Sequence, residues 1–277
     1  YAIKEVKNEF PYILFIGEVY NPSLYDTYIQ SGFDYLYDKV GMYDCVRGVI
    51  AGTRKPTEIT KQWQATDHIK NKMLYFLENH DEQRIASPFF ANDAEKGFPG
   101  VVVSSLLLPN PFMLYAGQEL GEPGMDAEGF SGRDGRTTIF DYWSLSTVRR
   151  AFTDCNLLTD EERKLSDSYR TLLNIAHREA AVREGEFFDL TYANQAQEGF
   201  DSCREYAFLR KKGDIIILVV ANFSSSDRLS DVIIPAHAFD FWQMPEMKVL
   251  SRELFSGRYV GMKLMRDSSV RVKVPAH

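Results

Sequence analysis

The chain has few cysteines. Its 277 residues include 3 of them, and Cys45, Cys155 and Cys203 lie too far apart for a zinc motif or a disulfide framework. We expect these thiols to be free and mostly buried, because an unpaired cysteine behaves as a small apolar side chain. Free thiols suit a reducing compartment without requiring one, so a cytoplasmic, periplasmic or secreted location stays open.

Long apolar runs are absent as well. No stretch approaches the roughly 18–20 apolar residues of a membrane-spanning helix, so we expect no membrane span. No secretory signal is visible, but residues 2–10 have the apolar spacing of the last turns of a helix, so we expect the true N-terminus to be missing. The formal net charge of −7 disfavours nucleic acid and anionic membrane surfaces as partners, because both are polyanions.

Motifs of several enzyme classes are missing too. The sequence contains no glycine-rich phosphate loop and no Gly-x-Ser-x-Gly elbow, so nucleotide-dependent enzymes and serine hydrolases of that type have no support. The composition is otherwise that of a globular protein, with 44% hydrophobic and 26% charged residues. The length allows one large or two medium domains with a sizeable core.

The first two thirds of the chain alternate between short apolar runs and helical patterns. We expect strands at residues 12–16, 33–37, 73–77 and 112–116, with helices between them. Such alternation is typical of a parallel sheet covered by helices. Because the runs at residues 12–16, 73–77 and 112–116 are short and continuously apolar, we expect these strands to be buried.

The last third has a different pattern. From Gly185 onward, short strand-like segments alternate with turns, and Lys212-Gly213-Asp214 is a hairpin signal. We therefore expect an all-β domain, a sandwich, at residues 185–277, after an α/β domain at residues 1–184. The strands are expected at residues 187–192, 205–210, 215–223, 228–234, 248–255 and 269–274.

Two of the expected parallel strands end in ionisable residues. Leu77-Glu78-Asn79-His80-Asp81 follows the apolar run 73–76, and Gly17-Glu18 follows the run 12–16. The carboxyl ends of parallel strands meet at one edge of a sheet, where α/β enzymes place their catalytic groups. We therefore take Glu18, His80 and Asp81 as the leading site residues.

These segments carry a resemblance to a known family. Ile16-Gly17-Glu18-Val19 and Phe76-Leu77-Glu78-Asn79-His80-Asp81 resemble two of the four signature regions of the α-amylase family (glycoside hydrolase family 13). Tyr115-Ala116-Gly117-Gln118-Glu119 is similar to the end of the family's eighth strand. The resemblance implies that residues 1–184 form the second half of a (β/α)8 TIM barrel, strands five to eight, followed by the family's trailing β domain.

The resemblance also implies roles for the site residues. Retaining glycoside hydrolysis needs two carboxyl groups about 5–5.5 Å apart, one a nucleophile and one a general acid. Glu18 would be the acid, and burial near other carboxylates is expected to raise its pKa. His80 and Asp81 would hydrogen-bond vicinal sugar hydroxyls, and Asp81 would also help to keep Glu18 protonated.

Other residues have weaker support. Tyr20 and Asn21 would line the rim of the same site and bind substrate. Arg84 would either meet sugar hydroxyls or form a simple salt bridge, and the sequence does not separate the two. Glu119 and Glu122 are not expected to be core catalysts.

One acidic loop and one aromatic pair complete the candidates. Asp126, Glu128, Asp134 and Asp141 crowd one region without the spacing of an EF-hand, so we interpret them as a solvated loop and assign no metal ligand. Tyr142 and Trp143 could stack on a sugar or pack against the outer helices.

Parts of the family pattern are missing from this sequence. The family carries its nucleophile in a Gly-x-Arg-x-Asp context and has an Asp-x-x-x-Asn-His stretch, and neither is present. The first four strands would be absent, with the loop domain that the family often uses to bind Ca²⁺, so we assign no cofactor to this chain. An acid without a nucleophile cannot complete the double displacement, so we expect the chain to be inactive alone. Half a barrel also exposes two strand edges, through which we expect the chain to self-associate.

The leading hypothesis is a fragment of a retaining hydrolase of α-1,4-linked glucans, starch or maltooligosaccharides. A transglycosylase or isomerase of the same family is an alternative that the motifs do not exclude. A non-catalytic glycan-binding protein on this fold is another, and an unrelated α/β enzyme is a third. Product analysis separates the first two, and binding without turnover identifies the glycan-binding protein.

Overall fold

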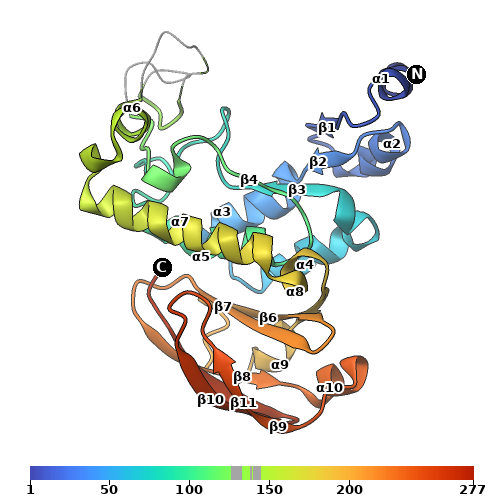
Figure 1. Cartoon of the computed structure of the whole chain (residues 1–277), viewed down its shortest axis with the longest axis vertical. Coiled ribbons are helices and arrows are strands. Elements are labelled where there is room, and N and C mark those ends of the chain that lie inside the picture. The colour runs from blue at the N-terminus through green and yellow to red at the C-terminus, as the bar shows by residue number, and fades with distance from the viewer. Residues whose placement is uncertain (126–132, 138, 140–144) are drawn as a thin grey trace.

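The computed structural model describes residues 1–125, 133–137, 139 and 145–277. A parallel sheet and its helices form one part of the molecule, and the strands that follow form a second part beneath it, with α5 (Phe98–Leu106) and α7 (Asp160–Arg178) lying between the two (Figure 1). Within the described residues, no helix is long and apolar enough to cross a bilayer.

The first part is built on a four-stranded sheet in the order β1-β2-β3-β4. All its pairings are parallel, which confirms the expected α/β arrangement. The carboxyl ends of the strands therefore share one edge of the sheet. The strands are β1 (Ile16–Gly17), β2 (Tyr35–Tyr37), β3 (Met73–Phe76) and β4 (Phe112–Met113).

The two outer strands differ from the prediction of fully buried strands. β1 is only two residues long, and Tyr12, Ile13 and Leu14 before it are 97%, 42% and 63% exposed. β4 also has two residues, both half-buried, whereas every residue of the central strand β3 is buried. An apolar run looks the same in a central and an edge strand, but an edge strand has a neighbour on one side only.

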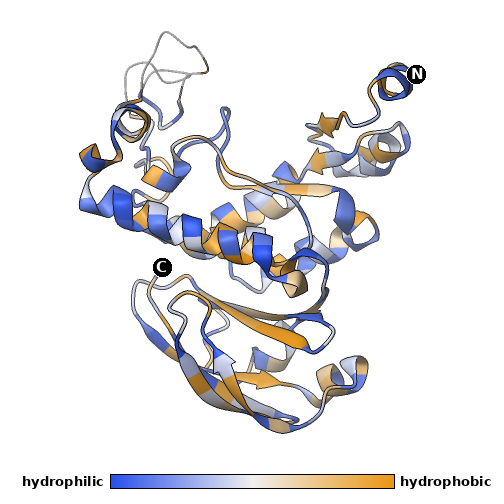
Figure 2. Ribbon diagram, in the orientation of Figure 1, coloured by the Kyte–Doolittle hydropathy of each residue, from blue (hydrophilic) through white to orange (hydrophobic). Residues whose placement is uncertain are grey.

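Helices cover the outer face of the sheet. Leu36, Met73 and Tyr75 point outward into the main core, where Val101 of α5 and Leu172 of α7 join them. Figure 2 shows hydrophilic and hydrophobic residues alternating along α7, as an amphipathic helix requires. The remaining helices of this part are α1 (Ala2–Glu9), α2 (Tyr25–Gln30), α3 (Asp44–Ile50), α4 (Glu58–Ala65), α6 (Ser146–Thr153) and α8 (Ala180–Arg183).

The second part consists mainly of antiparallel strands, with a sheet ordered β5-β6-β7 and the pairs β8–β11 and β9–β10. The predicted turn joins β6 to β7 and has Gly213 at a φ of +56°. β10 and the helices α9 and α10 were not predicted. The bounds are β5 (Glu186–Asp189), α9 (Thr191–Asn194), β6 (Glu205–Lys212), β7 (Ile215–Asn222), β8 (Arg228–Ile234), α10 (Ala236–Trp242), β9 (Met247–Arg252), β10 (Tyr259–Leu264) and β11 (Ser268–Val274).

A buried arginine joins the two parts. The guanidinium of Arg210 on β6 donates to the carbonyl oxygens of Leu107, Ala181, Val182 and Gly185 at 2.5–3.1 Å. Its side chain is 0% exposed, and burial lowers its pKa to about 10. The guanidinium thereby satisfies carbonyls that follow α5 and surround α8, which would otherwise lack donors.

The cysteines are only partly as predicted. All three are free thiols, and Cys45 is buried. Cys155 and Cys203 are exposed, which contradicts the expectation of mostly buried thiols. Both lie in short connections at the surface, where cysteine has no apolar core to join.

A second buried charge shapes the loop after β3. Glu78 Oε2 accepts from Arg84 Nη1 at 2.7 Å, and Glu78 Oε1 accepts from the backbone N–H of Ile85 at 2.7 Å. Arg84 Nη2 also donates to the carbonyl oxygen of Ala116 and to the hydroxyl of Thr137. Both charged side chains are at most 2% exposed. The pair therefore fixes the loop after β3 against the segment that follows β4.

The carboxyl group of Asp38, directly after β2, is buried and has one oxygen without a partner among the described residues. Its Oδ1 accepts from the backbone N–H of Gly41 at 3.1 Å and begins the turn at Lys39–Tyr43. Burial raises the pKa of Asp38 to about 6, against the opposing effect of the backbone hydrogen bonds.

The Glu78–Arg84 pair makes a stability prediction. Glu78→Gln leaves the buried guanidinium without a counter-charge, so we expect the free energy of unfolding to fall by about 3–5 kcal/mol. Glu78→Gln combined with Arg84→Met removes both charges and should cost less than the two single changes together. Urea unfolding of the four variants measures this coupling. Glu95→Gln at the exposed Glu95–Lys164 pair is the control, with an expected change below about 1 kcal/mol. Additive single and double changes would contradict the prediction.

Asp38 makes a prediction about pH. The folded pKa of about 6 exceeds the ordinary value, so the folded state holds a proton that the unfolded state releases first. The contribution of protonated Asp38 to the free energy of unfolding is complete below about pH 4. It falls by on the order of 3 kcal/mol as the pH rises through about 6. Asp38→Asn should flatten this fall while keeping an acceptor for Gly41. Thermal unfolding between pH 4 and 7 measures both slopes, and equal slopes would refute the assignment.

Candidate active site

Ionisable side chains follow three adjacent strands of the parallel sheet. Glu18 comes directly after β1, Lys39 follows β2 by two residues, and His80 and Asp81 follow β3. Because β1, β2 and β3 are parallel neighbours, these residues share the carboxyl edge of the sheet. This edge is the candidate active site.

Tyr20 is bonded to Glu18 at the first of these strand ends. Its hydroxyl donates to Glu18 Oε1 at 2.6 Å. The pKa of Tyr20 is raised, first by this hydrogen bond, then by burial, and then by the negative charges of Glu18, Asp81 and Glu82. Glu18, Asp81 and Glu82 therefore all lie near enough to Tyr20 for their charges to act on it. The sequence placed Tyr20 at the rim but did not predict its bond to Glu18.

Glu18 is exposed in this chain, which differs from the expected buried acid. The expectation depended on β1 being a strand buried on both faces, and β1 is instead the edge of the sheet. Among the described residues, no strand pairs with β1 on the side opposite β2. The bond of Glu18 to Tyr20 is therefore the contact that orients its carboxylate.

The loop after β3 presents His80 and Asp81 outward. Asn79 is 2% exposed, and its Oδ1 accepts from the backbone N–H groups of Asp81 and Glu82 at 3.0 and 2.9 Å. This side-chain turn holds the loop locally, as short polar residues commonly do. His80 Nε2 lies 3.6 Å from Asp81 Oδ2, and the two side chains are 43% and 37% exposed. Both remain available to a ligand.

Two predicted substrate-binding residues make local contacts, and of the two only Arg84 is buried. Arg84 is 1% exposed and paired with Glu78, so the structure shows the salt bridge that the sequence left as the alternative to sugar binding. Asn21 Oδ1 accepts from the backbone N–H and hydroxyl of Ser23 and caps the turn at Pro22–Leu24. Spacing along the chain placed both near Glu18 or Asp81, but could not show that their polar atoms are engaged locally.

A network at the end of β2 was missed by the sequence reasoning. Lys39 Nζ lies 3.1 Å from Glu82 Oε1 and 2.9 Å from Asp44 Oδ1. The hydroxyl of Tyr43 donates to Glu82 Oε2 at 3.0 Å. Asp38-Lys39 follows an apolar strand just as Glu18 and His80-Asp81 do, so the rule that found those residues could have found this network.

The inner face of the sheet is lined by aromatic and apolar side chains. Tyr43 stacks on Phe76 with ring centroids 4.8 Å apart, and Tyr37 lies 5.2 Å from Phe76. The pKa of Tyr37 is raised by burial and further by the charge of Glu18. We call Tyr37, Tyr43 and Phe76 the aromatic wall. Tyr35, Leu74 and Met113 belong to the same cluster.

Other candidate residues do not join this site. Glu122 is buried and accepts hydrogen bonds from the N–H of Gly124 and the hydroxyl of Thr147. Of the acidic loop, Asp134 pairs with Arg136 at 3.1 Å. Among the described residues, no group of three or more His, Cys, Asp and Glu side chains could hold a metal ion. The other predicted residues, Asp126, Glu128, Asp141, Tyr142 and Trp143, lie outside the described residues.

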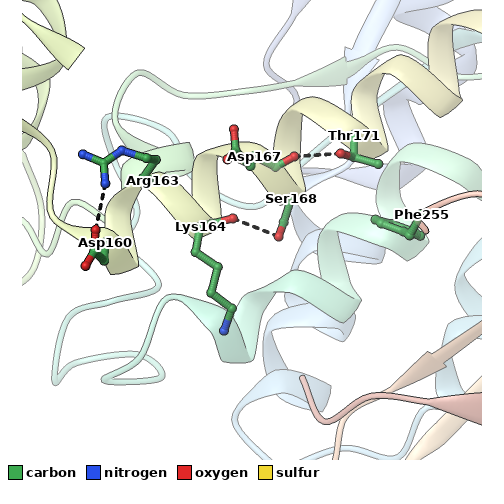
Figure 3. A pocket seen from close by; sticks show the side chains of 7 residues that line it. All are labelled: Asp160, Arg163, Lys164, Asp167, Ser168, Thr171 and Phe255. Carbon is green, nitrogen blue, oxygen red and sulfur yellow. Dashed lines mark hydrogen bonds and ion pairs between the residues drawn. The ribbon is translucent and has the colours of Figure 1, made fainter. Parts of the chain in front are cut away.

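A surface hollow of about 490 Å³ lies elsewhere, along the exposed face of α7 (Figure 3). Its charged side chains already pair with neighbours, as Asp160 does with Arg163 at 2.8 Å. It contains no strand end, so it is not the candidate active site. Its lining residues are Asp160, Arg163, Lys164, Asp167, Ser168, Thr171 and Phe255.

Comparisons with known proteins identify the fold. No protein-family model matches the chain, and no curated protein matches its sequence. The α-amylase of Geobacillus thermoleovorans complexed with acarbose matches with a TM-score of 0.68 and 17% identity over 99% of this chain and 54% of its own. An Anoxybacillus α-amylase gives 0.67 and 17% over 99% and 52%. The noncanonic maltogenic α-amylase of Thermotoga neapolitana gives 0.65 and 18% over 98% and 55%.

The chain thus spans about half the length of the solved structures that it matches. Identities of 17–18% establish the fold alone. The resemblance to α-amylases that the sequence predicted is confirmed at this level. The chain has the fold of a portion of these α-amylases, and Glu18 and the His80–Asp81 pair stand at the carboxyl edge of its parallel sheet.

Proposed function

We propose that this chain is the acid-bearing part of a retaining glycoside hydrolase that acts on α-1,4-linked glucans such as starch and maltooligosaccharides. The observation that carries the proposal is the position of Glu18, Tyr20 and the His80–Asp81 pair at one edge of a parallel sheet with an α-amylase fold. Solved structures of that fold contain acarbose, maltose and maltotriose.

Each residue then has a step in the reaction. Glu18 donates its proton to the glycosidic oxygen as the bond to the anomeric carbon breaks, and a carboxylate on the opposite side of the sugar forms the glycosyl–enzyme bond. Water then attacks the anomeric carbon and displaces that carboxylate, while Glu18 accepts a proton from the water. Tyr20 holds the Glu18 carboxyl in place through its 2.6 Å hydrogen bond.

His80 and Asp81 act on the sugar ring itself. Their exposed side chains, 3.6 Å apart, can receive two adjacent hydroxyl groups. Such hydrogen bonds strengthen as the ring flattens toward an oxocarbenium ion, so they favour the transition state over the bound substrate. Of the aromatic rings beside them, Tyr37 is partly exposed and can offer an apolar surface to the sugar, whereas Tyr43 and Phe76 are each only 1% exposed.

The open edges of the sheet support a larger assembly. β1 and β4 each have one paired side among the described residues, and Ile13, Leu14 and Ile16 at the β1 edge are at least 42% exposed. The chain also spans only about half of the α-amylases that it matches. In this proposal residues 1–184 are strands five to eight of the barrel, and residues 185–277 are its trailing β sandwich.

Further strands would supply the nucleophile, together with any Ca²⁺ site. Without further strands, the exposed edges would favour association of this chain with itself. The chain would also lack the nucleophile and be inactive. Among the matched solved structures is a cyclomaltodextrinase. Transfer of the glycosyl group to a sugar instead of water is an alternative outcome that the motifs do not exclude.

Activity tests the role of Glu18. We expect the chain extended upstream to a Gly-x-Arg-x-Asp segment to hydrolyse starch and maltooligosaccharides, and the present chain to be inactive. In the extended protein Glu18→Gln removes the acid and should lower kcat about 10²–10⁴-fold. Glu9→Gln, at an exposed site on α1, is the matched control and should leave kcat unchanged.

Three outcomes would change the proposal. Unchanged activity of Glu18→Gln would refute the assignment of the acid. Products longer than the substrate would identify a transglycosylase. Binding of acarbose without turnover in the extended protein would identify a glycan-binding protein on this fold.

Tyr20 gives a separate prediction. Tyr20→Phe removes the hydrogen bond to Glu18, and a bond to a charged group contributes about 1.5–3 kcal/mol, so we expect kcat to fall about 10–100-fold. KM should change less than about twofold, because the hydroxyl is engaged by Glu18 rather than by sugar. Tyr12→Phe, 97% exposed, is the control. A raised KM with unchanged kcat would instead support the rim role that the sequence predicted.

A further inference from the structure

An aromatic patch lies on the second part of the molecule, on α9 and α10. Tyr192 is 56% exposed and Phe241 is 61% exposed, and the exposed imidazole of His237 lies beside them. We call Tyr192, His237 and Phe241 the aromatic platform. The helices of the first part lie between α10 and the parallel sheet, so the platform is separate from the candidate active site (Figure 1).

Two buried rings support the platform from below. Phe188 on β5 has ring centroids at 6.3 Å from Tyr192, 5.7 Å from His237 and 6.0 Å from Phe241. Trp242 lies 5.6 Å from Phe188 and 6.2 Å from Phe241. Phe188 and Trp242 are only 9% and 7% exposed. The exposed rings therefore rest on a packed layer, and a ligand would find them already ordered.

The edges of the platform are polar, and none of its three members is a carboxylate, a lysine or an arginine. The hydroxyl of Tyr192 and Nδ1 of His237 lie 3.4 Å apart and can both serve a ligand hydroxyl. Asp240, on the next turn of α10, is paired with Arg266 at 2.6 Å. This combination of apolar faces and hydrogen-bonding edges suits a neutral ligand with alternating CH and OH groups, which is the surface of a pyranose ring.

We propose that the aromatic platform is a second binding site for α-glucan chains, remote from the catalytic edge. The proposal takes its ligand class from the proposed function. Three side chains are too few for a stable protein partner, which needs about 800 Å² and 20–30 residues on each side. A sugar ring needs only one or two aromatic faces, and preordered rings lose little entropy on binding.

A second binding site would increase the rate of hydrolysis of a long glucan chain relative to a short one. A starch chain held at the platform raises the effective concentration of its other segments at the catalytic edge. The gain applies only to chains long enough to reach both sites. We therefore expect the platform to affect activity on starch and to leave activity on maltotriose unchanged.

Binding is measured first on the chain as it stands. Maltoheptaose is titrated while tryptophan fluorescence is recorded, because Trp242 contacts both Phe188 and Phe241. We expect a saturable signal that Tyr192→Ala with Phe241→Ala weakens at least tenfold. Phe152→Ala, at a 92% exposed ring on α6, is the matched control and should bind as the parent does.

Further variants make the result specific. His80→Ala at the catalytic edge should leave the fluorescence titration unchanged, and Trp242→Phe should abolish its signal while calorimetry still detects binding. If alanine at the platform lowers the melting temperature, Phe241→Gln replaces it as a change that keeps side-chain bulk at an exposed position. Absence of saturable binding, equal binding by the platform variants, or loss of binding in His80→Ala would each overturn the proposal.

The two proposals fail in different ways. Platform binding without hydrolysis by the extended protein would refute the proposed function and leave the platform. Hydrolysis that depends on Glu18, together with unchanged starch activity in the platform variants, would refute the platform alone.

Discussion

The buried ion pair of Arg84 and Glu78 fixes the loop after β3, which carries His80 and Asp81 of the candidate site. Arg84 and Glu78 bind each other at 2.7 Å, and between them they also bind the backbone at Ile85 and Ala116. Burying two charges is costly, and only complete pairing makes it tolerable. The loop between them therefore has one arrangement, in which Asn79 is internal while His80 and Asp81 face outward.

The same sheet is rigid at its centre and open at its sides. β3 is buried along its whole length, whereas β1 and β4 are two-residue edge strands with unpaired sides among the described residues. Glu18 belongs to one of these edges and His80–Asp81 to the centre. In the proposed function, further strands beside β1 would supply the nucleophile and enclose Glu18.

The second part of the molecule contributes to the first through contacts at its surface. Arg210 on β6 donates hydrogen bonds to carbonyl oxygens in α8 and after α5. Asp189 at the end of β5 accepts hydrogen bonds from Thr60 and Trp63 of α4. These bonds attach the β-rich part to the helices behind the sheet. In Figure 1, α9 and α10 lie in the second part, below the helices that cover the parallel sheet, and these two helices carry the aromatic platform.

The sequence alone determined the parallel α/β order, the strand ends at Glu18 and His80–Asp81, and the hairpin at Gly213, because hydrophobic period, polar strand ends and turn residues are local properties. Only the tertiary structure decided that β1 is an edge, that Arg84 is buried against Glu78, and that Tyr20 holds Glu18. It also assembled Phe188, Tyr192, His237 and Phe241 into one surface. Those outcomes depend on which segments become neighbours in space, and a linear pattern of residue types does not contain that information.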